Sequence, residues 1–315
     1  MMMDTVATKI YPILIVDDDP TIRESIVNYL ANFHEAEYEL AIDSAADTPE
    51  AIALLNETAY SLVISDINLP NDSGFTILEH AREKHPDIRT ALITAYRVED
   101  YVRLAKDTGI FNIIAKTAPF NFDELSTVVD NLIAPERAFG LANYLDEDAE
   151  LHEFMIESSA QIMDIFYTLR QFLESNSAKE IDLLGTALIE ALTNAVYHAA
   201  KRPDGSLKYK KGQEIEALED HEKVRVTYGK DSERIGVCIA DQGGRITADE
   251  ILYWLDRNIS GAGLLDSHGR GVYLMHTLVD RLIINIAPQK RTEIIVLDYF
   301  SEEYSSNKPL YINQL

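Results

Sequence analysis

The chain of 315 residues is poor in cysteine and has no long apolar run. Because Cys238 is the single cysteine, no intramolecular disulfide can form, which favours a reducing compartment. No segment approaches the ~18 consecutive apolar residues of a membrane-spanning helix, and the N-terminal residues lead into a polar stretch without the apolar core of a signal peptide. We therefore expect a cytoplasmic protein with no membrane partner.

Positive charge is also scarce, with 28 Lys and Arg residues against 53 Asp and Glu residues and a formal net charge of −25. Such a field repels a phosphate backbone, and the sequence has no basic recognition helix, so a DNA-binding transcription factor or another nucleic-acid partner is disfavoured. The charge suits a partner with a basic face, or simply a soluble surface. With 46% hydrophobic residues, the chain is long enough for two domains with their own cores.

The first part of the chain alternates short apolar runs with amphipathic stretches. Continuous apolar runs are typical of parallel strands buried on both faces, so five strand–helix repeats predict a doubly wound, five-stranded parallel sheet. The expected strands are 11–16, 38–42, 61–65, 89–94 and 110–115, and the expected helices are 20–34, 48–58, 75–84, 98–107 and 122–133.

The second part predicts an α/β sandwich with a mixed or antiparallel sheet. Its expected strands are 151–157, 222–229, 234–240, 282–287 and 292–299, and its expected helices are 160–175, 179–200, 248–257 and 271–281. Residues 201–220 read as an exposed loop. We expect a first domain over 1–133, a partly helical connector over 134–150, a second domain over 151–300 and a polar, loosely ordered tail over 301–315.

Five polar residues follow strands of the first domain, namely Asp17, Asp18, Asp66, Thr94 and Lys116. Ligands of doubly wound sheets gather beyond the carboxyl ends of the strands. Carboxylate oxygens suit Mg²⁺, which also bridges to phosphate. These acids could instead merely face water, but their clustering at one end of the sheet favours a magnesium and phosphate site.

Residues 10–133 resemble the receiver domain of bacterial response regulators, which has a flavodoxin-like fold. The resemblance implies that Asp66 is the phosphoacceptor for a separate sensor histidine kinase. It also implies that Asp17 and Asp18 hold Mg²⁺ together with Asp66. Lys116 would pair with the phosphoryl oxygens, and Thr94 would donate a hydrogen bond to the phosphate.

Two positions depart from the receiver pattern. Ile113 stands where receivers usually carry an aromatic residue, and Tyr96 is a speculative substitute. Thr117 follows Lys116 directly where proline is usual, with Pro119 two residues further on. A cis bond before Thr117 would be costly, so we expect a remodelled loop and an altered signalling surface. Receivers often dimerise, which keeps a homodimer open, although this loop weakens the expectation.

The second domain carries Glu190, Asn194 and His198 at a spacing of four, which places them on one face of a helix. A carboxylate and an amide arranged in this way can activate a hydroxyl and complete a Mg²⁺ shell, although an ordinary amphipathic helix explains the spacing equally well. The buried face of this helix would consist of Leu184, Leu188, Ala191 and Ala195.

Two glycine motifs downstream favour the functional interpretation. Asp241 ends a strand and is followed by Gly243 in a tight turn, and the segment Gly269-Arg270-Gly271 opens a helix. Glycines at a helix N-terminus let backbone amides approach phosphate, where the helix dipole is favourable.

Residues 151–300 resemble the GHKL ATPases with the Bergerat ATP-binding fold, and in particular the anti-sigma-factor serine kinases. The segments 187–199 and 269–280 carry the resemblance. It implies bound ATP with Mg²⁺ and a lid over 245–268. Where many relatives have a second glycine two residues after Gly243, this chain has Arg245. The implied roles are general base for Glu190, Mg²⁺ ligand for Asn194, adenine contact for Asp241 and Gly243, and phosphate contact for Gly269 and Gly271, while Arg270 either reaches a phosphate or faces solvent.

No histidine is followed by the Glu-x-x-(Asn/Thr) pattern of a phosphodonor helix, and His80 and His198 belong to the two domains. The ATP-binding domain is therefore expected to be the output of the receiver. The predicted function is a response regulator that controls a serine/threonine-protein kinase or anti-sigma module. Its partner would be a small STAS-type anti-anti-sigma protein, with a sigma factor as a further target. The alternative is an ATP-dependent module that sequesters its partner without phosphorylating it.

Overall fold

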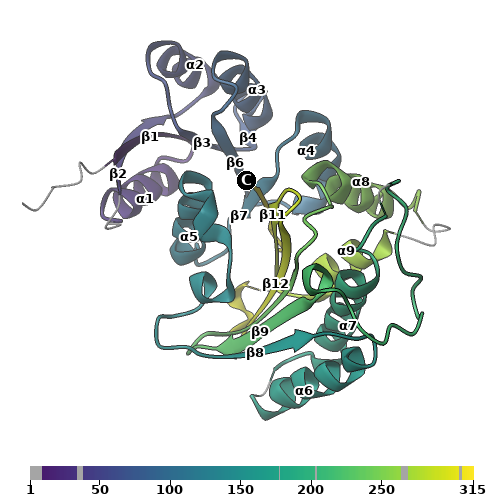
Figure 1. The fold of residues 1–315 in the computed structure, drawn as a ribbon. Coiled ribbons are helices and arrows are strands. Elements are labelled where there is room, and N and C mark those ends of the chain that lie inside the picture. The colour runs from purple at the N-terminus through teal and green to yellow at the C-terminus, as the bar shows by residue number, and fades with distance from the viewer. Residues whose placement is uncertain (1–8, 34–37, 177, 203, 264–268, 305–306) are drawn as a thin grey trace, which may run out of the picture. The chain divides into compact units, whose positions relative to one another are not determined.

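The structure is a computed structural model that describes the chain except residues 1–8, 34–37, 177, 203, 264–268 and 305–306 (Figure 1). Its internal contacts divide the chain into two compact units. The first unit comprises residues 1–96 and 112–134, and the second comprises residues 97–111 and 135–315. Each unit is described by itself.

Five strands of the described chain form the parallel sheet of the first unit, in the order typical of flavodoxin-like folds. In spatial order they are β2 (Tyr38–Ala45), β1 (Lys9–Val16), β3 (Leu62–Asp66), β6 (Arg89–Thr94) and β7 (Asn112–Ala115). A short hairpin of β4 (Asn68–Leu69) and β5 (Asp72–Ser73) follows β3. The central strand β3 is buried along its whole length. The doubly wound parallel sheet expected from the sequence is confirmed.

Capping residues fix where the helices of the first unit begin. Asp19 accepts a hydrogen bond from the backbone N–H of Thr21, and Asn121 accepts one from Glu124. Pro20 follows Asp19 at the first helical position, where its missing N–H costs nothing. The helices are α1 (Pro20–Ala31), α2 (Thr48–Glu57), α3 (Gly74–Lys84) and α5 (Phe122–Ile133). Because each helix begins at a defined capping residue, the strand end before it remains available for polar side chains.

The second unit is an α/β sandwich built on a mixed sheet, as expected. All strand pairs are antiparallel except β11 with β13, which is parallel. In spatial order the strands are β13 (Leu310–Gln314), β11 (Arg281–Ala287), β12 (Arg291–Tyr299), β10 (Arg234–Asp241), β9 (Val224–Lys230) and β8 (Glu150–Ile156). The long helices are α6 (Gln161–Ser175), α7 (Ile181–Tyr197), α8 (Ala248–Ile259) and α9 (Arg270–Leu278), of which α7 and α9 pack against each other.

The segment Arg97–Phe111 belongs to the second unit by its contacts. Instead of the single helix expected over 98–107, it forms a 3₁₀ turn, η1 (Val98–Tyr101), followed by α4 (Val102–Thr108). Helix α4 packs against α8. Asp256 of α8 accepts hydrogen bonds from Arg103, at 3.3 Å, and from Lys106. Although burial opposes ionisation, these two cations hold the pKa of Asp256 below its usual value.

The connector consists of two short 3₁₀ turns, η2 (Pro135–Ala138) and η3 (Leu141–Tyr144). The Tyr144 hydroxyl donates to the carbonyl of Ala138 at 2.8 Å, and the amide of the buried Asn285 donates to the same carbonyl. The Gly140 N–H donates to Glu293 at 2.8 Å. The connector is therefore tied to β11 and β12 by polar contacts.

The expectation that residues 301–315 form a loose tail is wrong for their last part. Leu310–Gln314 form β13, which pairs with β11 so that Ile312 lies opposite Ile284. Asn313 donates to the side chain of Asn285 at 2.8 Å. The polar composition of the segment concealed a run of apolar residues just long enough for one buried strand.

Among the described residues, no helix combines the length and the apolar character needed to cross a bilayer.

We predict that Ile312→Ala lowers the free energy of unfolding of the second unit by about 2–4 kcal/mol, because Ile312 is 1% exposed and its removal leaves a cavity. Leu315→Ala is the matched control, because Leu315 is 50% exposed and its loss costs less than about 0.5 kcal/mol. Urea unfolding followed by the fluorescence of Trp254, the single tryptophan, measures both. Equal effects of the two substitutions would show that β13 does not contribute to this core.

Candidate functional site

The first candidate site is a carboxylate cluster at the carboxyl ends of β1 and β3. Asp17 directly follows β1, and Asp66 is the last residue of β3. One ligand oxygen from each of Asp17, Asp18 and Asp66 lies within 4.8 Å of the others. Asp17 and Asp66 are buried, whereas Asp18 is exposed. The structure thus brings together the three acids that the sequence singled out.

Lys116 contacts both buried acids of this cluster, Asp17 and Asp66. Its Nζ atom lies 2.6 Å from Oδ2 of Asp66 and 2.7 Å from Oδ2 of Asp17. Burial raises the pKa of Asp17 above its usual value, although Lys116 partly opposes this shift. Burial would lower the pKa of Lys116, but its close contacts with the carboxylates of Asp17 and Asp66 raise it on balance. The lysine is therefore charged at neutral pH.

The donor set of this cluster fits a hard divalent cation. Oδ2 of Asp17 is buried and, despite its close approach to Lys116, accepts no hydrogen bond of regular geometry from the described chain. Mg²⁺ prefers carboxylate oxygens and keeps several waters. The exposed Asp18 leaves room for those waters. The cluster can therefore hold Mg²⁺ beside Asp66.

Thr94 lies at the end of β6 and is fully buried. Its hydroxyl accepts a hydrogen bond from the Tyr96 N–H at 3.1 Å, and its carbonyl accepts one from the Lys116 N–H at 2.7 Å. Tyr96 itself is 62% exposed, and Ile113 is buried in β7. The position that is usually aromatic is thus occupied by the buried Ile113, whereas the candidate substitute, Tyr96, is exposed.

In the loop after Lys116, the cis peptide bond joins Ala118 to Pro119. The hydroxyl of Thr117 donates to the carbonyl of Pro119 at 2.7 Å. The cis bond thus lies two residues further along the chain than the position directly after the lysine. The loop departs from the usual receiver pattern, as expected from the sequence.

The second candidate site is a cavity of about 930 Å³ within the second unit. Glu190, Asn194 and His198 line it, and His198 ends α7 with its N–H donating to the carbonyl of Asn194. The opposite face of α7 is buried as expected, since Leu184, Leu188, Ala191 and Ala195 are all at most 6% exposed. The volume is that of a typical small-molecule site.

The glycines at the start of α9 are required by close packing. A Cβ atom on Gly271 would lie 2.4 Å from Oε1 of Glu190 and 2.9 Å from Nδ2 of Asn194. Gly269 has a φ of +85°, and a Cβ atom there would lie 2.0 Å from the ring of Trp254. Only glycine lets α9 begin this close to the polar face of α7.

Asp241 ends β10 on the wall of the same cavity. Its Oδ1 atom accepts hydrogen bonds from the N–H groups of Gly243, at 2.7 Å, and Gly244, at 3.2 Å. Burial raises the pKa of Asp241 to about 6, although these bonds and others from Thr292 oppose the shift. Asp241 is therefore ionised at neutral pH and can accept a hydrogen bond from a ligand.

Sequence reasoning missed several lining residues, among them Trp254, Tyr209 and Lys211. Trp254 lies on α8, within the expected lid, of which residues 264–268 lie outside the described chain. The cations that line the cavity are Lys201, Lys210, Lys211, Arg245 and Arg270. In a chain with only 28 basic residues, a run of lysines in the predicted loop 201–220 was the signal available.

Comparison with known proteins identifies both halves of the chain. Residues 13–130 match the response regulator receiver domain, and residues 158–296 match the histidine kinase-like ATPase domain. Response regulator Rre1 of Synechocystis sp. is 33% identical over 155 residues, which are 47% of this chain and 62% of that protein. Transcriptional regulatory protein PmrA of Pectobacterium parmentieri is 37% identical over 122 residues, 38% of this chain and 51% of that protein.

Among solved structures, a CheY-like receiver domain protein of Methanospirillum hungatei is 28% identical, with a TM-score of 0.34, and covers 42% of this chain and 100% of its own. The chain covers 62%, 22% and 51% of the length of three curated relatives. The chain joins a response regulator receiver domain to a histidine kinase-like ATPase domain.

Proposed function

We propose that this protein is a response regulator whose ATPase domain is an ATP-dependent serine/threonine-protein kinase or anti-sigma output acting on a STAS-type anti-anti-sigma partner. The observation that carries the proposal is the pairing of Glu190 and Asn194 on one wall of the cavity, directly against the turn at Gly271. A carboxylate and an amide at a glycine-rich helix start suit a phosphate-transfer site.

In the receiver domain, Asp66 is the proposed phosphoacceptor of a separate histidine kinase. A carboxylate oxygen of Asp66 forms a bond to phosphorus while the bond between phosphorus and the donor histidine nitrogen breaks. Lys116, already 2.6 Å from Asp66, balances the negative charge of the incoming phosphoryl group. Asp17, Asp18 and Asp66 would hold Mg²⁺, which supplies further charge stabilisation when bound.

In the ATPase domain, Asp241 would accept the adenine amine, and Asn194 would hold the metal that accompanies ATP. Glu190 would accept the proton of a partner serine as the serine oxygen bonds to the terminal phosphorus of ATP and the bond to the ADP oxygen breaks. Gly269 and Gly271 open α9 toward the phosphates.

The charges around the cavity favour an anionic ligand. Among the described residues, five basic ones line it against three acidic ones, Glu190, Asp241 and Glu250, although the whole chain carries a net charge of −25. A local excess of cations in an acidic protein concentrates anions at that place. A nucleotide with its phosphates has both the size and the charge for this cavity.

The segment Arg97–Phe111 is the proposed route by which the receiver controls the output. The segment begins at Arg97, three residues after Thr94, which would sense the phosphoryl group. Its helix α4 pairs with Asp256 of the lid helix α8. At its end, the carbonyl of Phe111 accepts a hydrogen bond from the Ile312 N–H at 3.1 Å. A change at Thr94 can thus act on α8 through α4.

We predict that Glu190→Gln abolishes phosphoserine formation while ATP affinity changes less than about threefold, because the amide cannot accept the serine proton. The measurement incubates the protein with Mg-ATP and a panel of STAS-type proteins, followed by mass spectrometry. Glu216→Gln, at an exposed position outside the cavity, is the control. Partner binding by the parent protein without any phosphoserine would favour the alternative, an ATP-dependent sequestering module.

We predict that adenine nucleotides bind more weakly as the pH falls through about 6, because protonated Asp241 cannot accept the adenine amine. The pKa of Asp241 is raised, so the ionised, accepting form is present above about 6 and lost below it. Calorimetric titrations between pH 5 and pH 8, for the parent and Asp241→Asn, provide the measurement. The variant should lack the midpoint near 6, whereas titration of the phosphates affects both proteins alike. Identical profiles would exclude this role for Asp241.

We predict that Asp256→Lys uncouples the receiver from the output, because it repels Arg103 and Lys106 instead of binding them. In the parent, acetyl phosphate should change nucleotide affinity, and in the variant this response should fall at least about threefold. The charge swap Asp256→Lys with Lys106→Asp is the control and should restore part of the response. An undiminished response in the single variant would rule out this route.

A further inference from the structure

Between α7 and β9, the loop residues 204–213 are closely tied to their surroundings. The Lys208 N–H donates to the carbonyl of Ala200 at 3.0 Å. The guanidinium of Arg202 donates to the carbonyls of Leu207, at 2.5 Å, and Lys208, at 3.0 Å. At the far end, the Tyr197 hydroxyl donates to the carbonyl of Gln213 at 3.0 Å. The loop is thus held to the residues that follow α7 at its near end and to α7 itself at its far end.

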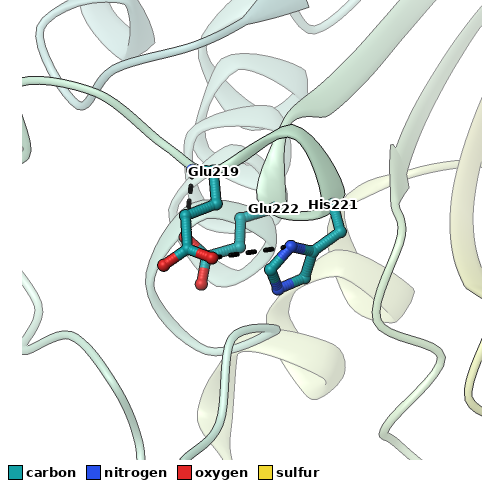
Figure 2. Close-up of side chains that lie close together, drawn as sticks. All are labelled: Glu219, His221 and Glu222. Atoms are coloured by element: carbon teal, nitrogen blue, oxygen red, sulfur yellow. Dashed lines mark hydrogen bonds and ion pairs between the residues drawn. The ribbon is translucent and has the colours of Figure 1, made fainter.

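A cluster of charged residues just before β9 fixes the middle of this loop. Glu219, His221 and Glu222 lie close together in Figure 2. The ammonium of Lys208 lies 2.6 Å from Glu219 and 2.5 Å from Glu222, and the Tyr209 hydroxyl donates to Glu222 at 2.7 Å. Glu219 and then Glu222 raise the pKa of Lys208. Although three ligand atoms of this cluster are close enough for a metal, the cation it holds is the Lys208 ammonium.

This anchoring places two further lysines at the cavity. Lys210 and Lys211 both line it. Nζ of Lys211 lies 3.2 Å from Oε2 of Glu190, the proposed general base. The side chain of Lys211 is 59% exposed, so the ion pair is weakly held and the ammonium can exchange the Glu190 carboxylate for another anion.

We propose that residues 208–213 form a phosphate strap, in which Lys211 binds the terminal phosphate of ATP and leaves Glu190 when the nucleotide enters. The inference rests on the proposed ATP site and adds a ligand to it. A phosphate with several charged oxygens is a stronger partner for an ammonium than one carboxylate. Without a terminal phosphate, Lys211 stays with Glu190, so the base becomes free only when there is a phosphoryl group to transfer.

The test compares affinities for ADP and for the non-hydrolysable ATP analogue with an imido bridge, measured by calorimetry with Mg²⁺. Lys211→Met should weaken analogue binding about tenfold or more, because a charge-assisted contact is lost, and should change ADP binding less than about twofold. Lys211→Arg should keep most of the analogue affinity. Lys230→Met, an exposed lysine at the end of β9 outside the cavity, is the matched control and should bind both nucleotides like the parent.

The outcomes separate this inference from the proposed function. If the parent binds neither nucleotide, the ATP site itself is wrong. If the parent binds both and Lys211→Met does so equally well, the strap is wrong and the ATP site stands. Equal losses for ADP and the analogue would likewise overturn the role of Lys211 at the terminal phosphate. Tyr209→Phe, which loosens the anchor at Glu222, should weaken analogue binding several-fold, and parent-like binding would overturn the anchoring.

Discussion

The second site depends on the close approach of α9 to α7 at Gly271. The hydrogen of that glycine is all that separates the α9 backbone from the side chains of Glu190 and Asn194. Any larger residue would push these side chains aside or move the start of α9, and the cavity would lose either its polar wall or its helix N-terminus. Because Trp254 closes over Gly269 in the same way, the two glycines together fix α7, α8 and α9 around one space. The cavity is thus a consequence of backbone packing as much as of the polar residues that line it.

Lysines between carboxylates recur in this acidic protein and serve two purposes. Lys208 lies between two glutamates and, through them, holds a loop in place. Lys116 lies between two aspartates at the proposed phosphorylation site, and Lys211 lies against Glu190. In these last two places, under the proposals above, a phosphate would replace a carboxylate as partner of the ammonium, because it carries more charge. The same contact is structural where both carboxylates are anchored and functional where a ligand can enter.

The sequence was sufficient for features that depend on local pattern. Buried apolar runs located the parallel strands, and the carboxyl ends of those strands carried Asp17 and Asp66 into one cluster. The four-residue spacing placed Glu190 and Asn194 on one face of α7, and the glycines marked the start of α9. These inferences need only the geometry of one helix or one sheet edge.

The features that the sequence did not predict all depend on partners far along the chain. β13 is a strand because β11 offers it an edge, and nothing in Leu310–Gln314 indicates that pairing. The role of Lys211 follows from the anchoring of its loop by Glu219 and Glu222, which no periodicity reveals.

The position of α4 also depends on partners far along the chain, and it bears on the proposed signalling route. Two features make the segment part of the second unit. Its apolar side chains Val98, Val102 and Ala105 are almost fully buried, and two of its cations contact Asp256 of α8. Yet its sequence position lies within the residues that match the receiver domain. Helix α8 also carries Trp254, which packs over Gly269, so α4 contacts the helix that forms part of the cavity wall.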